Sequence, residues 1–227
     1  MRMSADCDKM RKKGRIEKVK NRCFIVGAGD YSDLWIPGKD DFVIAADAGY
    51  SHLALRGIIP ELIVGDFDSL SVLPEHDRIL RSPTQKDYTD MALAVKEGLA
   101  LGYTSFLLDG GLGGRLDHSF ANIQLLANIS QYGTGILLGR DFCVTAVKNG
   151  CVNFSSCESG YISVFSADEE ARGVSIKGLR YPLRDAVLKN DFSLGVSNEF
   201  VGKPATVCVS EGTLIIMWEV FGKLTTS

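Results

Sequence analysis

Several signatures are absent from this sequence, and each absence excludes a class of protein. No apolar run approaches the roughly 18 to 20 residues that cross a bilayer, and the amino-terminal region has no apolar block like that of a secretory signal peptide. Positive charge is not in excess, since 25 Lys and Arg are outnumbered by 28 Asp and Glu, whereas nucleic-acid-binding domains are usually basic. We therefore expect a cytoplasmic protein with no membrane and no nucleic-acid partner.

Motifs for metal binding and catalysis are missing as well. The cysteines form no CxxC pair and have no histidine partners nearby, so we expect reduced thiols and neither a zinc site nor a disulfide framework. They are Cys7, Cys23, Cys143, Cys151, Cys157 and Cys208. The sequence has no GxxxxGK(S/T) phosphate loop, no complete dinucleotide-binding glycine motif and no GxSxG nucleophile. Its function must therefore come from other groups of residues.

The first half of the chain has the pattern of alternating strands and helices. Short apolar runs that end in Gly or Asp indicate buried strands from Cys23 onwards, namely CFIVGAG, FVIAADAG, LIVGDFDS and SFLLDGG. Thr89 can cap a helix between two of these runs. In that helix Met91, Val95 and Leu99 lie four residues apart, and Phe120, Ile123 and Ala127 mark one face of a later helix. This alternation predicts a mostly parallel sheet with helices on both faces.

The second half has the pattern of an all-β unit. After about Gly139 the helical period gives way to short β-type runs such as FCVTAV, YISVF and TLIIMWEV, which are separated by turn residues. The sequence thus predicts an α/β N-terminal domain with a mostly parallel sheet, plus an all-β C-terminal sandwich domain. We place a basic tail at residues 1–22, the α/β domain at 23–139 and the β-sandwich at 140–227.

Acidic residues follow two of the predicted elements. Asp66 and Asp68 come directly after the apolar run 62–64, where they can share a divalent cation at the mouth of the sheet or make turn hydrogen bonds. Asp90 stands in the first turn of a predicted helix, where a carboxylate is favoured by the helix dipole whether or not it has a function. Because parallel sheets bind ligands beyond the carboxyl ends of their strands, we expect these groups to lie close together.

The segment from Asp109 to His118 is harder to explain as structure alone. It contains four glycines in five residues, which lets a ligand approach the backbone closely. Arg115 follows directly and offers a planar set of donors that suits phosphate oxygens. A triphosphate fits this segment better than a neutral ligand does.

In their order, these segments resemble the thiamine pyrophosphokinase family. The matching segments are Asp47-Ala48-Gly49, GDFDS at 65–69, TDxxxA at 89–94, GGxGGRxDH at 110–118, KGLRYPL at 177–183 and GVSNE at 195–199. One departure is Ala48, where the family commonly has glycine. The resemblance implies Mg²⁺-dependent transfer of a pyrophosphoryl group from ATP to the hydroxyl of thiamine, giving thiamine diphosphate and AMP. It also implies a homodimer with its sites between subunits.

The resemblance also implies roles for individual residues. The catalytic, metal-centred carboxylates would be Asp66, Asp68, Asp90 and Asp117. The nucleotide contacts would be Asp47, Lys86, Arg115, His118 and Ser119. Ser197 and Trp218 are candidate thiamine contacts in the β half, although Trp218 can equally be a core residue of its strand.

Two other functions stay open at this point. One is a Mg²⁺-dependent nucleotide phosphotransferase that acts on a different alcohol. The other is a module that binds thiamine or a nucleotide without catalysis. The sequence speaks against the second, because a binding module does not need four carboxylates around a polyphosphate site.

Overall fold

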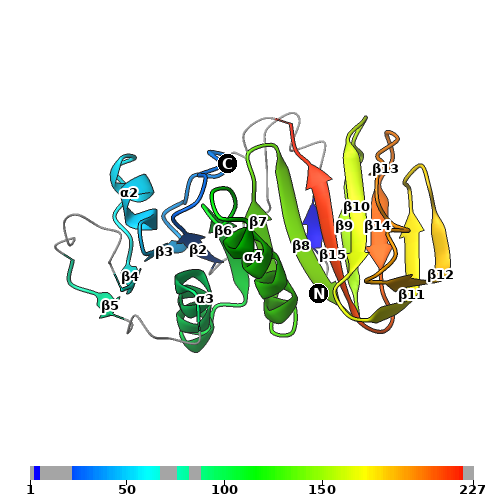
Figure 1. Ribbon diagram of the computed structural model, residues 1–227. Coiled ribbons are helices and arrows are strands. Elements are labelled where there is room, and N and C mark those ends of the chain that lie inside the picture. The colour runs from blue at the N-terminus through cyan, green and yellow to red at the C-terminus, as the bar shows by residue number, and fades with distance from the viewer. Residues whose placement is uncertain (1–2, 6–21, 67–75, 82–87, 222–227) are drawn as a thin grey trace.

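The computed structural model describes residues 3–5, 22–66, 76–81 and 88–221, and its strands form two sheets (Figure 1). The larger sheet contains β2 (Arg22–Val26), β3 (Asp41–Ala46), β4 (Leu62–Gly65), β5 (Ile79–Arg81), β6 (Ser105–Asp109), β7 (Thr134–Leu138), β8 (Phe142–Lys148), β10 (Tyr161–Ser166), β13 (Asn198–Glu199) and β15 (Thr213–Glu219). The smaller sheet contains β1 (Met3–Ala5), β9 (Cys151–Phe154), β11 (Glu170–Lys177), β12 (Leu183–Lys189) and β14 (Ala205–Cys208).

The larger sheet joins the two halves of the chain. Its strand order is β13-β10-β15-β8-β7-β6-β2-β3-β4-β5. The strands from β7 to β5 are parallel, whereas β8, β15, β10 and β13 alternate in direction. The predicted α/β half with a mostly parallel sheet is therefore confirmed. Its sheet continues directly into the β half, as Figure 1 shows.

Helices α3 (Asp90–Ala100) and α4 (Leu116–Ile129) cover one face of the larger sheet. Cys23 and Ile25 of β2 pack on this side with residues of both helices. Thr89 caps α3 as predicted, because its hydroxyl accepts a hydrogen bond from the backbone N–H of Ala92 at 3.2 Å. No helix in the described ranges has the length and apolarity that a membrane span requires.

The buried face of α4 differs from the predicted one. Its buried residues are Ser119, Asn122, Leu126 and Ile129. The predicted face of Phe120, Ile123 and Ala127 instead lines an open groove, and the Phe120 side chain is 60% exposed. The apolar residues that recur along the sequence of α4 therefore mark the face that lines the groove, which is separate from the buried face.

The opposite face of the larger sheet is covered by α2 (Gly49–Ala54) and by the smaller sheet. Phe24 of β2 and Leu53 of α2 belong to the same core as the residues between the two sheets. In the sandwich, the ring of Phe154 makes edge contacts with Phe200 and Trp218, with centroids 5.6 and 5.5 Å apart. The β half is thus a sandwich made from one end of the large sheet and the small sheet.

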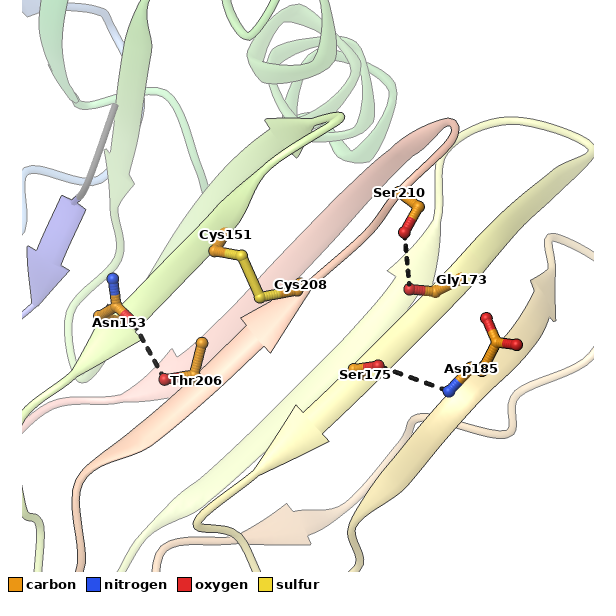
Figure 2. Close-up of a disulfide and its surroundings, with 8 residues drawn as sticks. All are labelled: Cys151, Asn153, Gly173, Ser175, Asp185, Thr206, Cys208 and Ser210. Atoms are coloured by element: carbon orange, nitrogen blue, oxygen red, sulfur yellow. Dashed lines mark hydrogen bonds between the residues drawn. A yellow bond between two sulfur atoms is a disulfide. The ribbon is translucent and has the colours of Figure 1, made fainter.

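The prediction of reduced cysteines is wrong for the β half. Cys151 of β9 and Cys208 of β14 are directly opposite each other in the small sheet and form a disulfide (Figure 2). Their neighbours on the same face are Asn153 and Thr206, whose side chains share a 2.9 Å hydrogen bond. This face points away from the sandwich core. The prediction failed because it considered spacing along the chain, whereas antiparallel pairing brings together cysteines 57 residues apart.

Of the other four cysteines, Cys7 lies outside the described residues, and the remaining three are of two kinds. Cys157 is also disulfide-bonded, which is a second correction to the prediction. Cys23 and Cys143 are free and buried, as expected for thiols that pack in the core. Burial raises the pKa of both thiols well above the ordinary value. These two groups are therefore protonated and unreactive at neutral pH.

Candidate active site

Two glycine-containing segments meet at the carboxyl ends of β2 and β6. We call residues 27–30 the first glycine segment and residues 110–114 the second glycine segment. Backbone hydrogen bonds from Gly29 N to Gly110 O (2.7 Å) and from Asp30 N to Leu112 O (2.7 Å) join the two segments, and Gly27 N donates to Asp109 O at the end of β6 (2.8 Å). These bonds continue the pairing of β2 with β6 beyond the strands. The two segments therefore act as one wall.

This close approach requires glycine at particular positions. A Cβ atom on Gly29 would lie 2.3 Å from the carbonyl oxygen of Leu112. Gly110 has a φ of 61°, and a Cβ there would lie 2.3 Å from the carbonyl oxygen of Gly27. Because neither distance is compatible with a side chain, the glycines bring the two backbones into direct contact. Their remaining polar groups can then face a ligand.

A cavity of about 300 Å³ opens beyond these strand ends. Its walls include both glycine segments. Four of the predicted site residues also line it, and they come from three separate parts of the chain: Asp47, Asp90, Arg115 and His118. Asp47 follows β3, Asp90 begins α3, and the other two lie at the start of α4. The predicted convergence at the carboxyl ends of the sheet is therefore present for these residues.

Asp66 lies beside Asp47 at the end of the neighbouring strand. The N–H of Asp47 donates to the carbonyl of Val64 at 2.8 Å, and a Cβ on Gly65 would lie 3.1 Å from the Cα of Asp47. Asp47 has a φ of 49°, an uncommon conformation for a residue other than glycine. Both residues are half-buried. The predicted residues Asp68 and Lys86 lie outside the described residues.

Arg115 and Asp117 form an ion pair at the mouth of the cavity. Nη2 and Nε of Arg115 donate to the two carboxylate oxygens of Asp117 at 2.6 and 3.2 Å. This contact lowers the pKa of Asp117 below its ordinary value. The side chains are 71% and 64% exposed, and ion pairs that are exposed to this degree contribute little to stability. A phosphate group could therefore replace the carboxylate at little cost.

Ser119 supports the second glycine segment from within the protein. It is buried, and its hydroxyl donates to the carbonyl oxygens of Arg115 at 3.3 Å and Gly113 at 3.4 Å. It does not line the cavity. Its contact in the structure is thus with the second glycine segment.

The structure adds two residues that the sequence did not indicate. Asn122 lines the cavity, and its Nδ2 donates to the carbonyl of Gly111 at 2.7 Å. Its position four residues after His118 places both on one face of α4, a signal that could have identified it. His52 of α2 has its Nε2 2.9 Å from the carbonyl oxygen of Gly29. This contact ties the first glycine segment to the helix behind it.

The two matching motifs of the β half contact each other. The side-chain amide of Asn198 accepts from the N–H of Tyr181 at 2.9 Å and donates to its carbonyl at 2.7 Å. Arg180 donates to Glu199 at 2.8 Å. Ser197 is exposed, with a φ of 58°, and its N–H donates to the hydroxyl of Ser163 at 3.1 Å. These contacts fix the loop that presents Ser197.

Trp218 is a core residue, one of the two interpretations that the sequence left open. Its side chain is 2% exposed and lies between the two sheets against Phe154. Stacking of this indole on a ligand would require the sheets to separate. Neither Ser197 nor Trp218 lines the cavity at the glycine segments.

The fold belongs to the α/β class, in which ligands bind in the crevice beyond the carboxyl ends of the parallel strands, and the cavity lies at that place. Comparison with known families identifies it further. Residues 34–138 match the family description "Thiamin pyrophosphokinase, catalytic domain", and residues 151–214 match "Thiamin pyrophosphokinase, vitamin B1 binding domain". The chain therefore belongs to the thiamin pyrophosphokinase family.

Individual relatives agree with this assignment. Thiamine pyrophosphokinase of Bacillus subtilis is 29% identical over 202 residues, which cover 85% of this chain and 90% of that protein. A crystal structure of the Bacillus subtilis thiamine pyrophosphokinase has a TM-score of 0.78 at 25% identity, covering 88% of this chain and 99% of that one. The enzyme from Geobacillus thermodenitrificans gives 0.76 at 26% identity, with coverage of 90% and 100%.

Proposed function

We propose that this protein is a thiamine diphosphokinase, which transfers a pyrophosphoryl group from ATP to the hydroxyl of thiamine and releases thiamine diphosphate and AMP. The observation that carries the proposal is the cavity at the glycine segments, where Asp47, Asp90, Arg115 and His118 meet. Membership of the thiamin pyrophosphokinase family supplies the identity of the two substrates.

The polyphosphate of ATP would lie along the two glycine segments. Arg115 would exchange Asp117 for phosphate oxygens, which its planar guanidinium can bind in pairs. Asp47, His118 and Lys86 would contact the rest of the nucleotide, with Ser119 holding the second glycine segment from behind. Such positioning and charge neutralisation account for most of the rate acceleration in phosphoryl transfer.

Magnesium belongs to the same proposal. Carboxylate oxygens are ligands that Mg²⁺ prefers, and it is often held by one or two of them together with substrate phosphates. Asp90 lines the cavity and Asp66 follows β4 beside Asp47, so these two fit the ion, with Asp68 and Asp117 as the other candidates. Among the described residues no group of three or more His, Cys, Asp or Glu is placed to hold a metal. In the proposal the substrate phosphates complete the shell of the ion. The bound ion would supply charge neutralisation on the transferred and leaving groups.

Thiamine would bind where a second copy of the chain completes the site. The groove beside α4 has a volume of about 650 Å³ and is lined by apolar residues including Phe120 and Phe192, which are 60% and 67% exposed. Leu194 and Val196, near Ser197, are 48% and 40% exposed. An apolar surface of this kind is typical of an interface. We infer a homodimer in which Ser197 and its loop face the cavity of the other copy.

The same proposal gives each half of the chain a role in substrate binding. Residues 23–139 would bind ATP and carry the catalytic carboxylates. Residues 140–227 would supply the thiamine contacts. The cationic thiazolium would be attracted by the carboxylates around the cavity, while the metal separates these from the phosphates.

The deciding experiment is incubation of the purified protein with ATP, Mg²⁺ and thiamine, followed by quantification of all nucleotide and thiamine products. AMP that appears in equal amount to thiamine diphosphate supports the proposal. ADP as the nucleotide product would indicate a simple kinase instead. Absence of turnover would indicate a binding module.

A further inference from the structure

Asp109 is a buried carboxylate with no exposed surface at the end of β6. Its Oδ1 accepts from the backbone N–H of Ser32 at 2.8 Å and from its neighbour Gly110 at 2.7 Å. Its Oδ2 accepts from the hydroxyl of Ser32 at 2.8 Å. The same hydroxyl accepts from the N–H of Leu34 at 3.1 Å. The side chain of Asp109 therefore links the loop that follows β2 to the loop that follows β6.

These loops are the ones that form the wall of the cavity. Ser32 follows the first glycine segment by two residues, and Gly110 is the first residue of the second glycine segment. The backbone bond from Gly27 N to the carbonyl of Asp109 itself, and the bond from Gly29 N to Gly110 O that joins the two segments, lie next to the carboxylate. A shift of Ser32 or Gly110 would thus change the distance between the two glycine segments that form the wall of the cavity.

Asp109 itself does not line the cavity. Burial of a carboxylate is unfavourable unless its oxygens are hydrogen-bonded, and here three donors meet that requirement. Burial nevertheless raises its pKa to about 6. An apolar residue at this strand end would avoid that penalty but could not hold Ser32.

We propose that Asp109 is a positioning residue for the nucleotide: by binding Ser32 and Gly110 it sets the spacing of the two glycine segments along which the polyphosphate lies. This inference rests on the proposed function, because it concerns the same cavity. It assigns Asp109 an effect on nucleotide affinity that acts through the backbone, with no contact to the ligand.

The test compares Asp109→Ala, Asp109→Asn and Ser32→Ala. Asparagine keeps the Oδ1 acceptor and can donate to the Ser32 hydroxyl, whereas alanine removes all three bonds. We expect Asp109→Ala to raise the Kd of the α,β-methylene analogue of ATP, with Mg²⁺ present, roughly tenfold or more. Asp109→Asn should stay within about threefold of wild type, and Ser32→Ala should fall between the two.

A matched control separates positioning from general stability. Asp41 is also a buried carboxylate and accepts from Arg22 and from the N–H of Gly38 at 2.8 Å. It lies at the start of β3, at the opposite end of the sheet from the cavity. Asp41→Ala should lower Tm and leave the analogue Kd unchanged.

The outcomes decide the inference independently of catalysis, because binding of the analogue needs no thiamine and no turnover. Unchanged Kd in Asp109→Ala, with only Tm lowered as in Asp41→Ala, would overturn it. Failure of wild type to bind the analogue would overturn it too. If Asp109→Ala does not fold, Ser32→Ala decides, since unchanged affinity in that variant contradicts the inference. Wild type that binds the analogue but makes no thiamine diphosphate would refute only the proposed function.

Discussion

Arg115 and Asp117 neutralise each other across the mouth of the cavity, with Nη2 of the arginine 2.6 Å from Oδ2 of the aspartate. Both side chains are mostly exposed. The ion pair therefore holds the guanidinium close to the second glycine segment and leaves it accessible to a ligand. Binding of a phosphate would separate a weak ion pair and form a stronger, charge-assisted contact.

Arg115→Lys should weaken the use of ATP, because an ammonium group cannot bind two phosphate oxygens in the planar arrangement of a guanidinium. We expect kcat/KM for ATP to fall about tenfold or more, with KM for thiamine nearly unchanged. Steady-state kinetics with each substrate varied in turn measure this. Arg172→Lys is the control, since Arg172 is also exposed and pairs with Glu170 in the small sheet. An unchanged ATP dependence in Arg115→Lys would remove this residue from the phosphate site.

Asp90→Asn should abolish most turnover while the fold remains. The amide has nearly the same size but is a poorer ligand for Mg²⁺, and loss of the charge in the first turn of α3 costs only about 0.3–1 kcal/mol. We expect kcat/KM to fall about a hundredfold or more, with a higher Mg²⁺ concentration needed for half-maximal rate. Activity measured over a Mg²⁺ titration checks this.

Glu97 provides the control for Asp90, because it is another acidic residue of α3, near the opposite end of the helix. Glu97→Gln should leave both the rate and the Mg²⁺ dependence unchanged. Near wild-type kinetics in Asp90→Asn would exclude its carboxylate from metal binding.

Much of the fold could be predicted from local patterns. β2, β4 and β6 are buried along their whole length, so their apolar runs were easy to identify. The helix cap at Thr89 could also be predicted, because it involves only this residue and the helix that it begins. The position of β15 between β8 and β10 in the large sheet, in contrast, depends on which strands meet in space, and no local pattern of the sequence contains that information. The Cys151–Cys208 disulfide was missed for the same reason.

The features of the candidate site likewise divide into local ones, which the sequence shows, and long-range ones, which depend on packing. The second glycine segment and Arg115 are adjacent in the sequence, and their chemistry was visible there. The bond from Ser32 to Asp109 joins residues 77 positions apart, and the contact of His52 with Gly29 depends on the packing of α2. The groove beside α4 combines both cases, since the apolar face of Phe120 was predicted but its exposure was not.

Phe120→Glu should convert the proposed homodimer into a monomer. A charge in the middle of an apolar interface is strongly unfavourable, and standard interfaces bury about 800 Å² on each partner. Sedimentation velocity should show a dimer for wild type and a monomer for the variant, with loss of thiamine affinity if the other copy completes the site. Tyr132→Glu is the control, because Tyr132 is also 60% exposed but lies outside this groove. A monomeric wild type would contradict the proposed assembly.

Replacement of the Cys151–Cys208 disulfide should destabilise the protein. A crosslink between residues 57 apart restricts the unfolded chain, and such disulfides typically contribute about 2–4 kcal/mol. We expect the Cys151→Ala, Cys208→Ala double variant to lose about this much in urea unfolding. The control is Asn153→Ala with Thr206→Ala, which removes the adjacent cross-strand hydrogen bond and should cost only about 0.5–1.5 kcal/mol. Equal losses in the two variants would show that the covalent link adds nothing.

The stability of the fold should depend on pH through Asp109. Burial raises its pKa from 3.8 to about 6, although hydrogen bonds from Ser32 and Gly110 oppose the rise. A carboxyl group whose pKa is higher in the folded protein stabilises the fold when it is protonated. Its contribution is complete below about pH 4 and is lost as the pH rises through about 6.

Wild type should therefore lose about 3 kcal/mol of unfolding free energy relative to Asp109→Asn as the pH rises from about 4 to about 7. The asparagine variant lacks the titrating group but keeps the Oδ1 acceptor, so the difference between the two proteins isolates this carboxyl. Urea unfolding of both across the pH range measures it. A difference that stays constant with pH would mean that Asp109 titrates at its ordinary value, and that the burial seen here is relieved in solution.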